Sequence, residues 1–326
     1  MPSYLDPANL QSFQKELMGV WSNDGVPTAD NGGPLSYNIM PLPQLSPSNT
    51  DAVAFHGYIL KNFAYTETST FGRETAQAPN RGGQGTQIVD ALFYEQVVAF
   101  AEGPGSTPKP PGNTVHVENG AWLYLQGDYQ DIGPYKSSPR HYENFPIPRQ
   151  DPMTMIAKQA AVPHGNSILA IGHLDGEADG APDIADATPP YPTCGSLQVP
   201  HQRFDTKLAA NTPVGFENPN PDWAKNPNLP VRLAIEAIKP DSYVHWYVST
   251  ERLKQRGLQD GVTNILFEQH LSNVARYDAD YWLLRKGSDK YLAYVQTMYM
   301  SIDLLNQNVC QFQHITCNTI KWQRNI

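Results

Sequence analysis

The alternation of apolar and polar residues along the chain predicts a series of β-strands. Short runs rich in aromatic and β-branched residues repeat with a two-residue period, which is the period of a strand with one buried face. The runs that fit best are 37–40, 53–65, 87–102, 114–125, 154–161, 167–174, 232–238, 242–249, 280–285, 291–302 and 310–322. We therefore expect an all-β protein.

The connections between these runs favour a barrel. Lys286-Gly-Ser-Asp-Lys290 lies between two of them and is a strong hairpin signal. About ten strands joined mostly in sequence predict a single antiparallel up-and-down β-barrel, which leaves no exposed edge. The whole chain, 1–326, is assigned to this one domain. A division into two domains would have to fall near 175–230, and that alternative stays open.

Two kinds of segment depart from the strand pattern. Residues 6–18 predict a short N-terminal helix, because Leu10, Phe13 and Leu17 recur at helical spacing. Long stretches rich in Pro, Gly, Asp and Asn are expected to be loops that cap the barrel, and the main ones lie near 23–50, 126–152 and 175–230.

Composition narrows the class of protein. The net charge of -9 argues against a nucleic-acid partner, because such proteins need a basic surface. No apolar run reaches the roughly 20 residues of a membrane span, and the N-terminus lacks a secretory signal, so we expect a soluble, cytoplasmic protein without a membrane partner. The 3 cysteines have no metal or redox spacing. A homo-oligomer stays open.

The first candidate for chemistry is a histidine on the last strand. Alternation places Phe312, His314 and Thr316 on one face of 310–322, which would be the interior face in a barrel. An imidazole there can ligate a metal or carry a proton. The competing interpretation is a hydrogen-bonded core histidine.

A second candidate strand is His116-Val-Glu118-Asn-Gly120-Ala-Trp122. Its two-residue period puts His116, Glu118 and Trp122 on one face, so an imidazole, a carboxylate and an indole would share the barrel wall. The alternative is a Trp122 that belongs to the core and a Glu118 that pairs with a neighbouring strand. His164, in a turn-like segment with Pro163 and Gly165, would lie at the rim.

Several short motifs, taken in order, resemble the nitrobindin-like barrels, a calycin-type haem-binding group, and in particular a longer, poorly characterised branch of it. The motifs that carry the resemblance are Gly19-Val-Trp21, Phe93-Tyr-Glu-Gln-Val97, His116-Val-Glu-Asn-Gly-Ala-Trp122, Ala161-Val-Pro-His-Gly165 with Gly172, Asn226-Pro-Asn-Leu229, Tyr294-Val-Gln-Thr297 and Gln313-His-Ile-Thr-Cys-Asn-Thr-Ile320.

The resemblance implies a ten-strand antiparallel barrel with an apolar lumen. It also implies that His314 matches the axial haem-iron ligand on the last strand, and that His116 lies on the opposite wall. The chain departs from the small haem-binding barrels in being about twice as long. It also has Gln313 where a proline is common before the histidine.

Two main hypotheses follow. The favoured one is a cofactor-free enzyme, a cyclase or pericyclase, isomerase or lyase of secondary metabolism, which preorganises a hydrophobic small molecule and donates hydrogen bonds to it. Its catalytic candidates are His314, His116 and His164, and its substrate-binding candidates are Trp122, Glu118, Tyr94, Trp282, Tyr294, Phe312 and Thr316. The alternative is a haem b protein with His314 on iron, acting on nitric oxide, peroxynitrite or peroxide. A third hypothesis is a carrier that returns a lipophilic metabolite unchanged.

Overall fold

The structure is a computed structural model. It describes residues 13–30, 34–43, 58–74, 78–79, 88–101, 112–126, 155–162, 166–187, 223, 226–250, 261–264, 272–304 and 308–326. The strands are β1 (Gly19–Ser22), β2 (Tyr37–Pro43), β3 (Tyr58–Glu74), β4 (Ala78–Pro79), β5 (Ile88–Phe100), β6 (Thr114–Gln126), β7 (Met155–Ala161), β8 (Asn166–Asp179), β9 (Ser242–Ser249), β10 (Gly261–Asn264), β11 (Ser272–Lys286), β12 (Asp289–Leu304) and β13 (Asn308–Arg324). The helices are α3 (Leu229–Ile238) and a short helix over 13–17.

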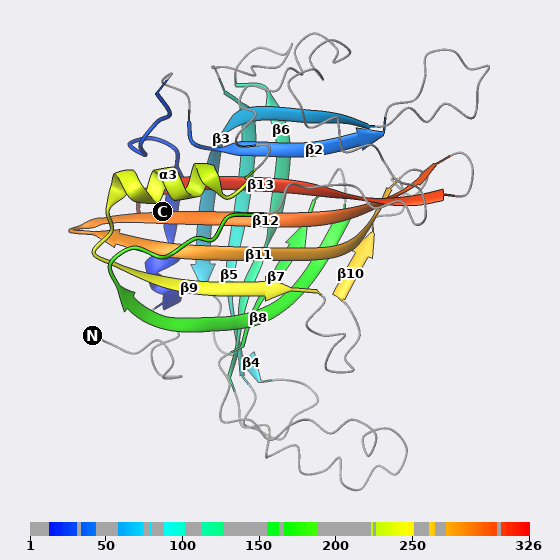
Figure 1. The fold of residues 1–326 in the computed structure, drawn as a ribbon. Coiled ribbons are helices and arrows are strands. Elements are labelled where there is room, and N and C mark those ends of the chain that lie inside the picture. Colours follow the sequence, from blue (N-terminus) through cyan, green and yellow to red (C-terminus); the bar gives the residue numbers. More distant parts are fainter. Residues whose placement is uncertain are drawn as a thin grey trace, which may run out of the picture.

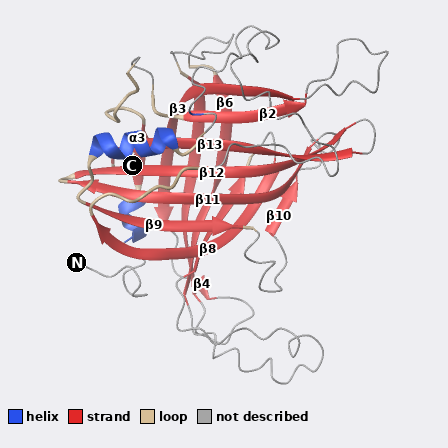
Figure 2. Cartoon of the chain, viewed as in Figure 1, coloured by secondary structure: helices blue, strands red, loops and turns tan. Residues whose placement is uncertain are grey.

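Ten of these strands form a closed antiparallel barrel, as the sequence predicts. The order β3-β2-β13-β12-β11-β9-β8-β7-β6-β5 returns to its start because β5 pairs with β3 along Tyr65–Phe71. Figures 1 and 2 show β9, β11, β12 and β13 crossing in front of β5, β6 and β7. Closure gives each of the ten wall strands two neighbours and leaves an interior face and an outer face.

Short strands complete the wall locally. Strand β2 pairs with β3 and β13 over one part of their length, and β1 takes the same place over another part. The predicted hairpin is confirmed: β11 and β12 run side by side from Lys286↔Asp289, and Gly287 has the positive φ of 54° that its turn requires.

Alternation along each strand produces two cores. The interior core holds the side chains of Trp122, Trp246, Tyr281 and Tyr294 together with Phe13 and Leu17 from the short helix. The outer core lies under α3 and includes Trp282, Leu284, Ile315 and Cys317. Figure 1 shows α3 across the outer side of β12 and β13.

The short helix 13–17 closes one end of the barrel. Phe13 and Leu17 are fully buried there, which confirms the predicted helical spacing over these residues; 6–12 lie outside the described residues. Arg285 donates to the Glu16 carboxylate from Nη2 at 2.8 Å, and it also pairs with Glu177 of β8. The helix is therefore held by the burial of its apolar side chains and by the ion pairs of Arg285 with Glu16 and Glu177.

The predicted strand 232–238 is wrong, because these residues belong to α3. Pro230 suits the first turn of a helix, and Val231, Ala234, Ile235 and Ile238 follow a spacing of three and four that buries one stripe. The left-handed Lys239 ends the helix by donating its backbone N–H to Ile235 O. None of the helices in the described part of the chain is long and apolar enough to cross a membrane.

Candidate functional site

The barrel interior changes character along its length, and we distinguish three layers. The plug layer, next to the short helix, is aromatic and contains Phe13, Trp21, Phe71, Tyr124 and Trp246. The polar layer comes next and contains Glu67, Tyr94, Glu118, Lys158, Tyr277, Tyr281 and Tyr294. The mouth layer contains Asn38, His116, Gln296, Met298, His314 and Thr316.

A buried ion pair lies at the centre of the polar layer. Lys158 Nζ is 3.0 Å from Glu118 Oε1, and the two side chains are only 5% and 4% exposed. Burial opposes the ionisation of Glu118, but Lys158, His116 and Tyr94 together outweigh it, so the pKa of Glu118 lies well below its usual range. Burial also opposes the charge on Lys158, yet Glu118 and the nearby tyrosines raise its pKa well above the ordinary value.

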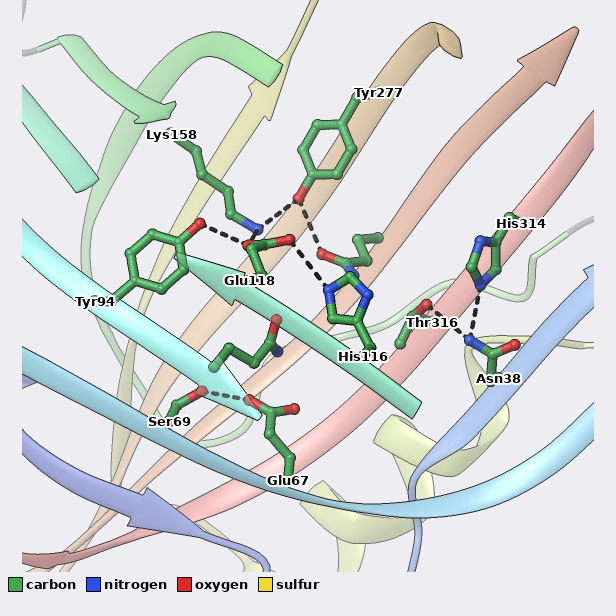
Figure 3. Close-up of polar contacts among 12 residues, drawn as sticks. Asn38, Glu67, Ser69, Tyr94, His116, Glu118, Lys158, Tyr277, His314 and Thr316 are labelled. Atoms are coloured by element: carbon green, nitrogen blue, oxygen red, sulfur yellow. Dashed lines mark hydrogen bonds and ion pairs between the residues drawn. The ribbon is translucent and has the colours of Figure 1, made fainter. Parts of the chain in front are cut away.

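Tyrosine hydroxyls surround this pair (Figure 3). Tyr94 donates to Glu118 Oε1 at 2.6 Å, while Lys158 donates to Tyr277 and Tyr281 at 3.1 Å each. The Lys158 ammonium also lies 5.3 Å from the ring centroid of Tyr277, within the range of a cation–π contact. Burial raises the pKa values of all three tyrosines, so the hydroxyls remain protonated near neutral pH.

A second carboxylate, Glu67, lies across the interior on β3. Its side chain accepts hydrogen bonds from Ser69 at 2.6 Å, from Tyr294 and from Asn318 Nδ2 at 2.8 Å. The orientation of the Asn318 amide is fixed, because its Oδ1 accepts from Asn23 Nδ2 at 2.8 Å. Unlike Glu118, Glu67 forms no salt bridge with a cation within the described residues.

A small cavity separates the two carboxylates. Its volume of about 20 Å³ has room for roughly one water molecule. Its polar lining is Glu67, Ser69, Tyr94, Gln96, Glu118, Lys158, Tyr281 and Tyr294, and Phe71, Trp122 and Leu292 supply its apolar floor.

The mouth layer holds the two histidines. His314 is half-buried, and its Nε2 lies 2.8 Å from Asn38 Nδ2, whose amide also donates to Thr316 Oγ1 at 3.3 Å. Burial, with the neighbouring His116 imidazole as a smaller cause, lowers the pKa of His314 to about 4. His314 is therefore a neutral imidazole at physiological pH, and its Nε2 accepts a hydrogen bond from the Asn38 amide.

His116 links the mouth to the ion pair. Its Nε2 is 3.6 Å from Glu118 Oε2, and its side chain is 29% exposed, while that of Glu118 is 4% exposed. Figure 3 shows His116 between Glu118 and the group formed by His314, Asn38 and Thr316. The imidazole of His116 therefore connects the buried ion pair with the mouth layer.

The structure brings most of the sequence-predicted site residues to one interior. Trp122, Glu118, Tyr94 and Tyr294 all line the cavity between the carboxylates. His116, His314 and Thr316 lie in the mouth layer. His164 and the side chain of Phe312 lie outside the described residues.

Trp282 is a correction, because its side chain does not face the lumen. The neighbouring Tyr281 belongs to the interior core, so alternation turns Trp282 to the outer core, where its ring stacks 5.3 Å from that of His245.

Lys158, Glu67 and Asn38 were not predicted from the sequence. Lys158 is the one charged residue in the run Met155-Ile-Ala-Lys-Gln-Ala-Ala161, and Ile156 and Ala160, which share its parity, face the interior core. Glu67 was missed because the predicted strand ended at 65, whereas β3 continues to Glu74. Asn38 lies on β2, within the predicted strand 37–40, but no sequence signal indicates its contact with His314.

The described residues do not fit haem as they are arranged. The Nε2 atom of His314 is engaged by Asn38, and that of His116 faces Glu118. The cavity between the carboxylates holds about one water rather than a macrocycle. Among the described side chains, no group of three or more His, Cys, Asp or Glu is arranged to hold a metal ion.

Comparison with protein-family models, with curated proteins and with solved structures finds no match to this chain. The closed ten-strand barrel is compatible with a calycin-like fold, but no family match supports the more specific resemblance to nitrobindin.

Proposed function

We propose that the barrel takes a small organic molecule into the mouth side of its interior and transforms it without a cofactor, as a cyclase, isomerase or lyase. The observation that carries the proposal is the polar layer, in which Lys158 and Glu118 are buried in the middle of a barrel. Removing such charges from water is costly, and well-packed apolar side chains could fill the same volume. Titratable groups with displaced pKa values cluster at functional sites.

The chemistry we assign to this site is proton transfer by His116. Lys158 keeps Glu118 ionised, and the ionised carboxylate stabilises the imidazolium that forms when His116 takes up a proton. Glu118 and Lys158 are thus positioning residues, and His116 is the catalytic residue. Proton removal and return by one base suits isomerisation or elimination.

The neutral His314 supports a second role on the same wall. Because its pKa is lowered to about 4, it stays uncharged. Its Nε2 accepts from the Asn38 amide, so its Nδ1–H can donate a hydrogen bond to a bound molecule. A molecule held between His116 and His314 would have its ends fixed relative to one another. Such positioning can supply about 7 to 11 kcal/mol of a cyclisation barrier in favourable cases.

The half-buried residues of the mouth layer support this location. His116, Gln296, Met298 and His314 are partly accessible to solvent, whereas Glu67, Glu118 and Lys158 deeper in the barrel are buried. Water therefore reaches the histidines from the mouth, and a ligand can follow the same route. We propose a substrate with a polar end, since the interior beyond the histidines is polar.

The proposal is tested by finding the bound molecule and following its fate. Native mass spectrometry of the purified protein should reveal a ligand, and the isolated ligand or its precursor should be converted by the protein. His116→Gln should keep binding but slow conversion by about 10² to 10⁴ fold. The control is Trp282→Phe, which alters a ring of the outer core and should leave the rate unchanged.

Two other results would replace this proposal. A molecule that binds and is returned unaltered would make the protein a carrier. A strong Soret band after addition of haemin, abolished by His314→Ala, would make it a haem protein. Rates that are equal in wild type and His116→Gln would remove His116 from the chemistry.

A further inference from the structure

The donors and acceptors around the cavity between Glu67 and Glu118 are unequal in number. All three ammonium hydrogens of Lys158 are engaged, by Glu118, Tyr277 and Tyr281. The hydroxyl hydrogens of the lining residues are engaged too. Tyr94 donates to Glu118, and Ser69 donates to Glu67.

The remaining hydroxyls follow the same pattern. Tyr294 donates to Glu67, and Tyr277 donates to Gln296 Oε1 at 3.0 Å, which leaves the hydrogen of Tyr281 directed to Tyr277 at 3.2 Å. Each ammonium and hydroxyl hydrogen of the polar layer is thus directed to a protein acceptor, and none of them is left for a guest.

Acceptor capacity remains. A carboxylate accepts about four hydrogen bonds, and Glu67 accepts three from described residues. Glu118 Oε2 has the long 3.6 Å contact to His116, and Gln96, which donates from Nε2 to Tyr294 at 3.4 Å, adds an amide oxygen. All three residues line the cavity.

The charge is unequal as well. Two carboxylates, Glu67 and Glu118, and one ammonium group, Lys158, face the cavity, so its lining carries a net charge of about -1 when all three are ionised. A buried carboxylate without a cation is costly, and a bound cation would remove that cost.

We infer that this cavity binds the protonated amino group of an organic molecule. An ammonium group is close to a water molecule in size, so it matches the roughly one-water volume, and it brings three hydrogen-bond donors to a site with unused acceptors. The rings of Tyr94, Tyr281 and Tyr294 line the same space and favour a cation further. The inference rests on the proposed function and names the substrate class as a primary amine.

The position of the cavity fixes the orientation of the amine. Trp122, Phe71 and Leu292 close the cavity on the plug side, while His116 and Gln296 lie on the mouth side. The carbon skeleton of the amine must therefore extend toward the mouth. That orientation carries its neighbouring carbon atoms past His116, the residue assigned to proton transfer.

The test compares n-butylammonium with n-butanol as probes of the wild-type protein at neutral pH by isothermal titration calorimetry. The two have the same chain length and differ in charge. Because a hydrogen bond to a charged group contributes about 1.5 to 3 kcal/mol, butylammonium should bind about tenfold to a hundredfold more tightly than butanol. Glu67→Gln should remove this difference.

The matched control is Asp289→Asn, which also removes one negative charge but from an exposed carboxylate paired with Lys321. It should leave butylammonium binding unchanged. Equal affinity for butanol and butylammonium in the wild type, or full butylammonium affinity in a folded Glu67→Gln, would overturn the inference. The comparison of the two probes on the wild type needs no variant, so a misfolded Glu67→Gln would still leave a decisive result.

Failure of this inference is distinguishable from failure of the proposed function. A protein that ignores butylammonium but converts its own neutral ligand in a His116-dependent manner would contradict only the amine assignment.

Discussion

Replacement of Lys158 by methionine should destabilise the barrel strongly. It should also make the stability of the protein increase as the pH falls from 7 toward 5. Methionine keeps the length of the side chain but removes the charge, and it leaves Glu118 at 3% exposure without its counter-ion. Removing one partner of a buried ion pair costs about 3 to 5 kcal/mol. With an unfolding entropy of about 2.1 cal/mol/K per residue, this corresponds to a fall in Tm of about 4 to 7 °C for a chain of this length.

The pH dependence follows from the sign of the pKa shift of Glu118. In the wild type the pKa is lowered, so the stabilisation is present above the unfolded value near 4.3 and is lost as the pH falls below it. Without Lys158, burial becomes the dominant influence and raises the pKa. The folded variant then binds a proton more readily than the unfolded chain, so its stability should increase as the pH falls from 7 toward 5.

The assay is urea denaturation followed by tryptophan fluorescence at pH 5 and pH 7, because Trp122 lies beside the pair in the same cavity wall. The double variant Lys158→Met with Glu118→Gln should recover much of the loss, since no unpaired charge remains. If Lys158→Met lowers the free energy of unfolding by less than about 1 kcal/mol, the pair contributes no more than a solvent-exposed ion pair, and the predicted cost of an unpaired buried Glu118 is wrong.

Three further predictions concern other described groups. NMR titration of His314 should give a pKa of about 4. Between about pH 6.5 and 4 the unfolded chain binds a proton on this histidine and the folded protein does not, so stability falls as the pH falls, and His314→Gln should reduce this loss. On the outer face, burial opposes the charge on His245, but the hydrogen bonds that His245 donates to Asp280 and Asp175 raise its pKa. Its stabilisation of the fold should therefore be present below pH 6.5 and fade as the pH rises through the folded value, and Asp280→Asn should weaken that dependence in a pH series of urea midpoints. Arg285→Leu should lower the free energy of unfolding by about 1.5 to 3 kcal/mol, because it removes the hydrogen-bond donor of Glu16. It should speed amide exchange in helix 13–17 more than in β11 and β12, and equal acceleration in all three would contradict a local role of Arg285.

The fold was largely predictable because alternation of side chains is a local property of a strand. Parity alone predicted that His116, Glu118 and Trp122 share one face, and the cavity wall contains Glu118 and Trp122. The same rule gives the outward face of Trp282 once Tyr281 is known to be interior. Its lumen assignment failed because parity does not say which of two aromatic neighbours faces inward.

The polar layer was less predictable because it depends on contacts between distant strands. Glu118 and Lys158 are neighbours only through the pairing of β6 with β7, where Trp122 lies opposite Lys158. The role of Glu67 requires the closing pair of β3 and β5 and the approach of Tyr294 from β12. Helix α3 was missed because Val231 and Ile235 are also strong strand formers, and the outer core decides between the two states.

The order of the three layers fixes how any ligand can be used. Trp122 and Trp246 pack closely against Tyr281 of the polar layer, with ring centroids 4.9 Å apart for Trp122 and Tyr281, and the short helix lies beyond them. Entry from the plug side would require this packing to open. A ligand admitted at the mouth meets His116 and His314 before it reaches the carboxylates, so its polar end must travel deepest. On the two proposals taken together, binding at the carboxylates and proton transfer at His116 would act on adjacent parts of the same molecule.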